Sequence, residues 1–151
     1  MLHKPEIILA ADHAGLKLKE RLIGYLSELG YTVTDKGAFG YDADDDYPDI
    51  MTEAALAVVE DPLHRRGIFL GGSGQGEAVC ANRIRGIRAA VYYGGSEEVV
   101  KLSREHNDAN VLALGARFLT LEEAERVARL WLETSFPGEE RHVRRINKID
   151  S

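Results

Sequence analysis

A glycine-rich segment from Gly71 to Glu77 (Gly-Gly-Ser-Gly-Gln-Gly-Glu) carries the strongest chemical signal in this sequence. Four of its first six residues are glycine, so the backbone can adopt left-handed angles and turn successive N–H groups toward one anion. The segment lacks the Gly-Lys-Ser/Thr of a P-loop, and Glu77 stands where a dinucleotide-binding motif has its third glycine. A plain turn needs only one or two glycines. The segment therefore favours an anion or oxyanion cradle that ends in a carboxylate.

Two further polar segments offer groups for chemistry: the pair Asp12-His13, and the stretch from His106 to Asn110 (His-Asn-Asp-Ala-Asn). A carboxylate beside an imidazole suits acid–base work or ligand anchoring, although a solvated turn explains this pair equally well. Asn and Asp are ordinary turn formers, so the second segment is open to both interpretations. A functional role for either segment is supported only if the fold brings the segments together at one site.

The C-terminal tail is basic, and it contains Arg141, His142, Arg144, Arg145 and Lys148. Arg141 and Arg145 are four residues apart, so on a helix they project from the same face and could clamp a phosphate. A solvated basic surface is the simpler explanation of such a run. Opposite charge gathers in the acidic stretch from Asp42 to Asp49. We expect its Asp42–Asp46 part to be a solvated loop, because it lacks the glycine and distal glutamate of an EF-hand.

Short apolar runs alternate with helical patterns along the whole chain. Buried strands are predicted at 6–11, 31–34, 67–70, 87–92 and 111–114. Helices are predicted at 15–29, 48–58, 77–83, 96–106, 120–131 and 141–148. Strict β–α alternation predicts one α/β domain over residues 1–151, with a C-terminal helical tail from about 139.

The predicted architecture is a doubly wound, five-stranded parallel sheet of Rossmann or flavodoxin type, with helices on both faces. Ligands of such sheets bind at the carboxyl ends of the strands. Asp12 and Gly71 directly follow the first and third predicted strands, and Arg117 follows the fifth. The predicted topology therefore places these three segments at the same edge of the sheet.

The composition is that of a globular protein and argues against several functional classes. The chain has 151 residues and a formal net charge of −6, with 44% hydrophobic and 29% charged residues, as in ordinary globular domains. The acidic balance argues against a nucleic-acid binder, and no apolar run approaches the ~18 residues of a membrane span. Cys80 is the single cysteine, and the amino terminus lacks a signal-peptide pattern, so we expect a cytoplasmic protein. No spacing of His and Cys resembles a zinc site.

Taken in chain order, these motifs resemble the type B ribose-5-phosphate isomerases, a family that includes galactose-6-phosphate and allose-6-phosphate isomerases. The matching segments are Ala11–Gly15, Asp46–Pro48, Gly72–Gly76, Ala81–Arg83, Gly86–Ala89, Ser103–Val111 and Arg141–His142. The resemblance covers nearly the whole chain. It implies aldose–ketose isomerisation of a sugar phosphate through a cis-enediolate, with neither metal nor organic cofactor, in the pentose phosphate pathway.

The resemblance also implies roles for individual residues. Many members use a cysteine base at the position of Gly71, whereas a second subgroup has a glutamate where Glu77 stands; Cys80 lies too far along the helix to substitute. A base within reach of C2 and an oxyanion donor are what proton abstraction next to a carbonyl requires. We expect the dipole of the following helix to favour the ionised form of Glu77. By similarity, Ser73 steadies the enediolate, and His106 and Asp12 open the furanose ring.

The remaining expectations concern substrate binding and assembly. Asn107 is expected to hold a sugar hydroxyl, and the residues expected to bind the substrate's phosphate or line its cradle are His13, Gly72, Gly74, Gln75, Gly76, Arg117, Arg141 and Arg145. Family sites lie between subunits, which implies a homodimer or a dimer of dimers. Two alternatives stay open: the same chemistry on a hexose 6-phosphate, and a non-catalytic phosphate-binding module.

Overall fold

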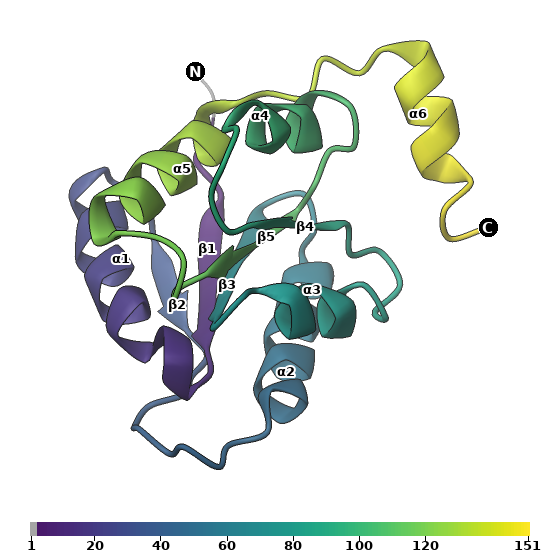
Figure 1. Cartoon of the computed structure of the whole chain (residues 1–151). Helices are drawn as coiled ribbons and strands as arrows, with labels where there is room; N and C mark the ends of the chain where they lie inside the picture. The colour runs from purple at the N-terminus through teal and green to yellow at the C-terminus, as the bar shows by residue number, and fades with distance from the viewer. Residues whose placement is uncertain (1–2) are drawn as a thin grey trace.

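The computed structural model describes residues 3–151, which form one sheet with helices on both of its faces (Figure 1). All five strands are parallel, in the order β2-β1-β3-β5-β4, which confirms the predicted α/β sheet. Their bounds are β1 Glu6–Ala11, β2 Val33–Asp35, β3 Arg65–Gly71, β4 Ala89–Tyr92 and β5 Val111–Gly115. Ala11 pairs with Leu70, and Gly71 pairs with Gly115, so the carboxyl ends of β1, β3 and β5 are aligned at one edge.

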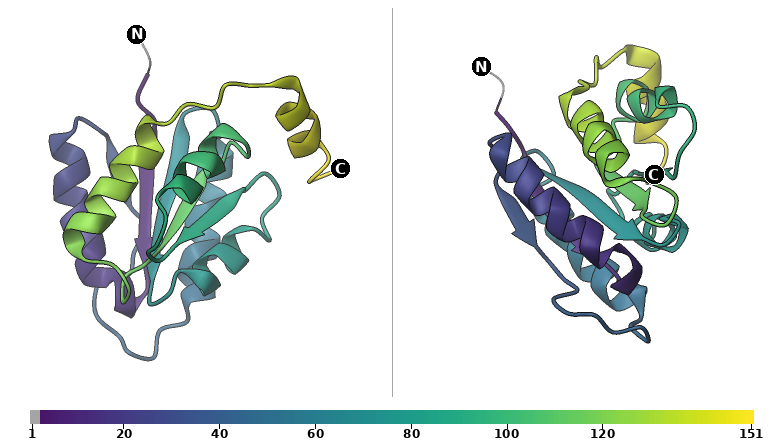
Figure 2. Two further views of the ribbon diagram at one scale, coloured as in Figure 1. Left: turned by 45° about the horizontal axis from the view of Figure 1, so that its top comes forward. Right: turned by 60° about the vertical axis from the view of Figure 1, so that its left-hand side comes forward.

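Seven helical segments complete the fold. They are the short 3₁₀ helix η1 His13–Gly15, and the α-helices α1 Leu16–Glu28, α2 Tyr47–Glu60, α3 Gln75–Ala81, α4 Glu98–Glu105, α5 Leu121–Glu133 and α6 Glu140–Asn147. Apolar side chains of α1, α4 and α5 pack on one face of the sheet, and those of α2 and α3 pack on the other (Figure 2). β1 shows the alternation that makes this possible, since Ile7 and Leu9 belong to one core and Ile8 belongs to the other.

Several helix ends follow the predicted local signals. Thr120 and Glu123 form the expected capping box at the start of α5, with the Glu123 N–H donating to Thr120 Oγ1 at 3.1 Å. Pro48 lies in the first turn of α2, where no backbone donor is needed. Gly30 ends α1 in the left-handed conformation, with φ of +89°.

Several predicted bounds differ from the structure: the starts of β3, β4 and α3 are each displaced by two residues, and hydrogen bonds explain two further differences. β2 begins at Val33 rather than Tyr31, because the Tyr31 N–H donates back to the Leu26 carbonyl and completes the end of α1 instead of joining the sheet. α4 begins at Glu98, because the Ser96 hydroxyl accepts from the Glu98 N–H in a turn that precedes the helix. Both differences arise where a side-chain or helix-end hydrogen bond competes with the element predicted from pattern alone.

Helix α6 stands apart from the layers of the domain in Figure 1 and in the left view of Figure 2. Two contacts tie this tail back: His142 stacks on His106, with ring centroids 4.4 Å apart, and Asp150 accepts from the Gly86 N–H at 2.9 Å. The last predicted helix is thus present, but most of its surface faces away from the domain. No helix among residues 3–151 is long and apolar enough to cross a membrane.

Candidate active site

The centre of the candidate site is the side chain of Glu77. This residue is the last of the glycine-rich segment and lies in the first turn of α3. Glu77 is only 3% exposed and Asp12, which follows β1, is 8% exposed. Burial, together with the negative charges of Asp12 and Asp45, raises the pKa of Glu77 to about 7. The backbone N–H groups at the start of α3 lower this pKa, in the direction expected from the helix dipole, but burial and the two neighbouring carboxylates outweigh them.

Asp12 is held in place by the backbone that follows it. Its Oδ1 accepts from the Ala14 N–H at 2.9 Å and from the Gly15 N–H at 3.2 Å, and so caps η1. A side chain on Gly15 would collide with the Leu70 carbonyl, since a Cβ there would lie 2.6 Å from its oxygen. This close approach of the β1 loop to β3 brings the Asp12 carboxylate beside Glu77.

Gly71 leaves the space that the Glu77 side chain fills. A Cβ built on Gly71 would overlap the carboxylate carbon and both carboxylate oxygens of Glu77. The end of β3 can therefore carry a side chain, or leave room for the Glu77 carboxylate, but not both in this arrangement. The absence of a side chain at 71 and the glutamate at 77 form one structural unit.

Gly71→Ala is expected to reduce kcat of any reaction that uses the Glu77 carboxylate by roughly 10- to 100-fold, because the added methyl group must displace that carboxylate. Steady-state kinetics on the variant measure this loss. Gly24→Ala, on the open surface of α1, is the matched control and should leave kcat unchanged. Wild-type kcat in Gly71→Ala would show that the position of the carboxylate is not critical.

The other positions of the segment require glycine for different structural reasons. Gly74 alone among Gly71, Gly72, Gly74 and Gly76 uses the left-handed conformation, with φ of +81°, whereas we expected this freedom throughout the run. A Cβ on Gly76 would lie 2.7 Å from the Tyr47 ring, so glycine there permits close packing of α2 on the segment. Ser73 Oγ accepts from the Gln75 N–H at 3.3 Å, which leaves its hydroxyl hydrogen free to donate to a ligand.

Cationic groups lie at the same edge of the sheet. His13 Nδ1 is 2.8 Å from Asp45 Oδ1, and this hydrogen bond raises the pKa of His13. Arg117 follows β5 and lies over the segment, with Nη1 3.1 Å from where a Cβ on Gly72 would be. The imidazole and the guanidinium could together bind an anion.

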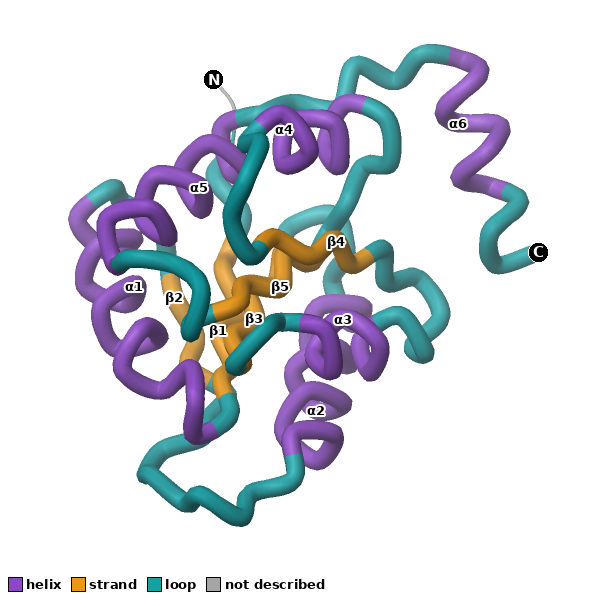
Figure 3. The backbone as a smooth tube through the Cα atoms, in the orientation of Figure 1, coloured by secondary structure: helices purple, strands orange, loops and turns teal. Residues whose placement is uncertain are grey.

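Asp45 is a site residue that the sequence analysis missed. It was expected to lie in a solvated acidic loop, but its side chain is only 12% exposed and accepts from both the His13 N–H and the ring. The loop between β2 and α2 folds back toward η1 to make this contact (Figure 3). One aspartate among four in a loop gives no sequence signal of this kind.

Four predicted site residues lie elsewhere: His106, Asn107, Arg141 and Arg145. His106 ends α4 and precedes β5, which places it toward the amino ends of the strands, whereas Glu77 follows the carboxyl ends. The length of β5 alone separates these edges by about 13 Å. Arg141 and Arg145 are carried by α6, and Arg141 pairs with Glu139 at 3.2 Å. One chain therefore presents two groups of predicted residues at two separate places.

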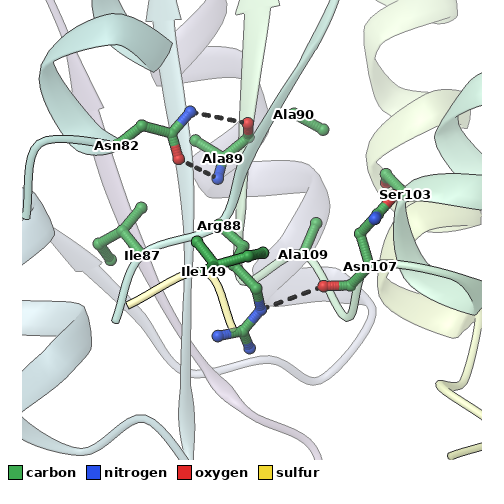
Figure 4. Close-up of a pocket in the computed structure, with 9 residues that line it drawn as sticks. All are labelled: Asn82, Ile87, Arg88, Ala89, Ala90, Ser103, Asn107, Ala109 and Ile149. Atoms are coloured by element: carbon green, nitrogen blue, oxygen red, sulfur yellow. Dashed lines mark hydrogen bonds between the residues drawn. The ribbon is translucent and has the colours of Figure 1, made fainter. Parts of the chain in front are cut away.

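The second group is braced by a polar network that the sequence analysis also missed. Arg88 donates to the Asn107 carbonyl at 3.1 Å, as Figure 4 shows, and to the Asp108 carbonyl at 3.0 Å. Asp108 has a left-handed φ of +45°, and its carboxylate accepts from Arg104 at 2.8 Å. Asn110 donates to the Gly86 carbonyl at 2.8 Å. Asn107 also borders a small pocket of about 230 Å³ (Figure 4).

Neither a metal nor Cys80 has an evident place at Glu77. No group of three or more His, Cys, Asp or Glu side chains within the described range 3–151 is arranged to hold a metal ion. The Cys80 thiol points to α2, where it lies 3.3 Å from Thr52 Oγ1 and 3.8 Å from the Pro48 carbonyl oxygen. The side chains gathered around Glu77 can thus supply a base, an oxyanion donor and cations for an anionic ligand.

Comparison with known proteins identifies close relatives. Residues 7–149 match the family described as Ribose/Galactose Isomerase. The chain is 43% identical over 141 residues to ribose-5-phosphate isomerase B of Mycolicibacterium paratuberculosis, covering 93% of this chain and 87% of that protein. It is 38% identical over 144 residues to ribose-5-phosphate isomerase B of Escherichia coli, covering 95% and 93%. The crystal structure of ribose-5-phosphate isomerase B from Mycoplasma genitalium with bound ribulose-5-phosphate superposes with a TM-score of 0.91 at 37% identity, over 98% of this chain and 95% of the other.

Proposed function

This chain belongs to the Ribose/Galactose Isomerase family, and we propose that it interconverts ribose 5-phosphate and ribulose 5-phosphate with Glu77 as the base. It is an aldose–ketose isomerase, similar over nearly its full length to proteins named ribose-5-phosphate isomerase B. The observation that carries the assignment of the base is the buried Glu77 carboxylate at the end of the glycine-rich segment, beside Asp12. With Glu77 as its base, the chain would belong to the subgroup with a glutamate rather than a cysteine base.

The proposed chemistry is a proton transfer between two carbons of the open-chain sugar. Glu77 takes the proton from C2 of the aldose, and the electron pair of that bond forms the double bond of a cis-enediolate. Glu77 then returns the proton to C1, and the proton of the O2 hydroxyl passes to O1, so that the ketose forms with its carbonyl at C2. A pKa near 7 suits this double role, because the carboxyl group must accept and release a proton at similar cost near neutral pH.

Neighbouring groups complete the mechanism. The Ser73 hydroxyl and the backbone N–H groups of Gly74, Gln75 and Gly76 stabilise the negative oxygen of the enediolate. His13 and Arg117 bind the phosphate at the same edge of the sheet. Asp12 acts with His106 to open the ring, and Asn107 holds a sugar hydroxyl.

We further propose that the site is shared between two subunits of a homodimer. Glu77, Ser73, Asp12 and His13 lie at one place on the chain, whereas His106, Asn107, Arg141 and Arg145 lie at another. Helix α6 projects from the domain and could carry its arginines to a neighbouring molecule (Figure 1). A second copy would then supply the ring-opening histidine and the two arginines that each Glu77 lacks in its own chain.

The function is tested by measuring kcat/KM for ribose 5-phosphate, allose 6-phosphate and galactose 6-phosphate. We expect the pentose phosphate to give the highest value. A preference for either hexose phosphate would assign the same chemistry to a longer substrate. Binding without turnover of all three would instead indicate a phosphate-binding module.

The dependence of kcat/KM on pH should show an acid limb with a midpoint near pH 7, because Glu77 must be ionised to accept the proton. Asp12→Asn should move this limb to lower pH, since it removes a negative charge that raises the pKa of Glu77. Asparagine keeps an oxygen that can accept from Ala14 and Gly15, so the loop should persist. An unmoved limb in Asp12→Asn would assign the titration to another group.

A further inference from the structure

We propose that a cleft at the amino-terminal edge of the sheet binds a phosphate group, free or carried by a small molecule. This arginine cleft, with a volume of about 500 Å³, is lined by His3, Lys4, Pro5, Tyr31, Arg66, Arg104, Leu132, Glu133, Thr134, Ser135 and Phe136. A smaller hollow of about 210 Å³ shares His3, Pro5, Arg66 and Arg104 with it. Arg66 lies near the start of β3, at the opposite end of that strand from Gly71, and none of the residues that we place in the active site lines the cleft or the smaller hollow.

Arg66 is the central group of this cleft because its charge is not balanced locally. It makes no ion pair with any carboxylate among residues 3–151, and its one hydrogen bond is a donation from Nη1 to the Leu132 carbonyl at 3.3 Å. Its guanidinium packs on the Trp131 ring, 5.6 Å from the centroid. Burial and the neighbouring charge of Arg104 lower the pKa of Arg66 to about 10. A bound anion would offset both effects.

Arg104 adds a second, nearly fully buried guanidinium, which is 3% exposed. It donates to Asp108 Oδ1 at 2.8 Å and to the carbonyls of Ala109 and Thr134. Asp108 also pairs with Arg88 at 3.5 Å, so one carboxylate serves two arginines. Asp108 makes no ion pair with Arg66, although its negative charge offsets part of the lowering of the Arg66 pKa by burial and by Arg104.

One buried hydrogen-bond donor beside the two arginines has no acceptor among residues 3–151. The indole N–H of Trp131, against which both Arg66 and Arg104 pack, is buried without an acceptor in the described part of the chain. Lys4 adds a cation at the rim and donates to the Leu29 carbonyl. Glu133 is the one carboxylate that lines the larger cleft, and Arg129 already pairs with it at 2.8 Å.

A phosphate group fits this set of donors. Its several oxygens can accept from a planar guanidinium in pairs, and its negative charge matches Arg66, which has no paired carboxylate of its own and lies beside the second guanidinium of Arg104. The cleft is far larger than one phosphate ion, so it has room for the organic part of a phosphate monoester. We therefore include both free phosphate and monoesters in the proposed ligand class.

Trp131 provides a local reporter, because it is the single tryptophan of the chain and its indole N–H gives one unambiguous NMR signal. Titration of the full-length protein with inorganic phosphate should shift this signal saturably, whereas potassium chloride at matched ionic strength should not. In Arg66→Gln the affinity should fall by about tenfold or more, as expected for loss of charged hydrogen bonds. Arg85→Gln removes the same charge from an exposed arginine outside the cleft and should bind as the wild type does.

Arg66→Lys keeps the charge but loses the paired donors, so its affinity for phosphate should lie between those of the wild type and Arg66→Gln. This variant tests the same site if Arg66→Gln fails to fold. Both Arg66 variants should retain wild-type kcat and KM for ribose 5-phosphate, which separates this site from the active site. A parallel titration with glycerol 2-phosphate distinguishes a monoester site from one for free phosphate, according to which binds more tightly. No saturable shift in the wild type, or equal affinity in Arg66→Gln, would overturn the proposal.

Discussion

Glu77→Gln is expected to lower kcat for isomerisation of ribose 5-phosphate by about 10³-fold, while the protein stays folded. Glutamine keeps the size of the side chain but cannot accept the C2 proton, and general-base catalysis contributes about 10²- to 10⁴-fold. The measurement is steady-state turnover at pH 8, where the wild-type carboxylate is ionised. The acid limb near pH 7 should disappear from whatever activity remains.

A measurement of the free energy of unfolding shows whether Glu77→Gln loses activity because the base is removed or because the protein unfolds. The pKa of Glu77 is raised in the folded state, so the folded protein binds more protons than the unfolded chain between its ordinary value of 4.5 and about 7. The free energy of unfolding therefore falls as pH rises through this range. Glu77→Gln removes this cost, and at pH 8 it should unfold with a free energy about 3 kcal/mol above that of the wild type. At pH 4.5 the two proteins should differ little.

Cys80→Ser is the matched control for this experiment and should keep wild-type turnover, because the thiol points to α2. Two results would contradict the role of Glu77. One is near wild-type turnover in Glu77→Gln. The other is a strong loss in Cys80→Ser, which would place the base on the cysteine instead.

Co-expression of two inactive variants, Glu77→Gln and His106→Ala, is expected to restore about a quarter of wild-type activity if each site is shared between subunits. Random pairing makes about half of the dimers mixed, and a mixed dimer has one site with both lesions and one with neither. The physical reason is that Glu77 and His106 lie at opposite edges of the same chain. Two affinity tags allow the mixed dimer to be isolated and assayed.

The control pairs two lesions of the same group, Glu77→Gln with Ser73→Ala. Every site of their mixed dimer carries one lesion, so activity should stay at the level of the parents. If Glu77 and His106 served one site within a single chain, the first pair would also remain inactive. A monomer in solution would exclude the shared site directly.

Much of the fold was predictable from the sequence, because its signals are local. The buried run of β1, the capping box at Thr120 and the stop at Gly30 act through neighbours in the chain, and all three appear as predicted. The bounds of β2 and α4 were less accurate. There, a hydrogen bond of Tyr31 to α1 and a turn at Ser96 compete with the pattern of apolar residues.

Site residues divide in the same way. Residue order and strand polarity were enough to predict that a glycine-rich segment, a glutamate and an Asp-His pair follow the strands of a parallel sheet. The contact of Asp45 with His13, and the space that Gly71 leaves for Glu77, became visible only in the folded chain. The same holds for the burial beside Asp12 that brings the pKa of Glu77 to about 7. These properties depend on distances between residues far apart in the chain, and the sequence does not contain them as a local pattern.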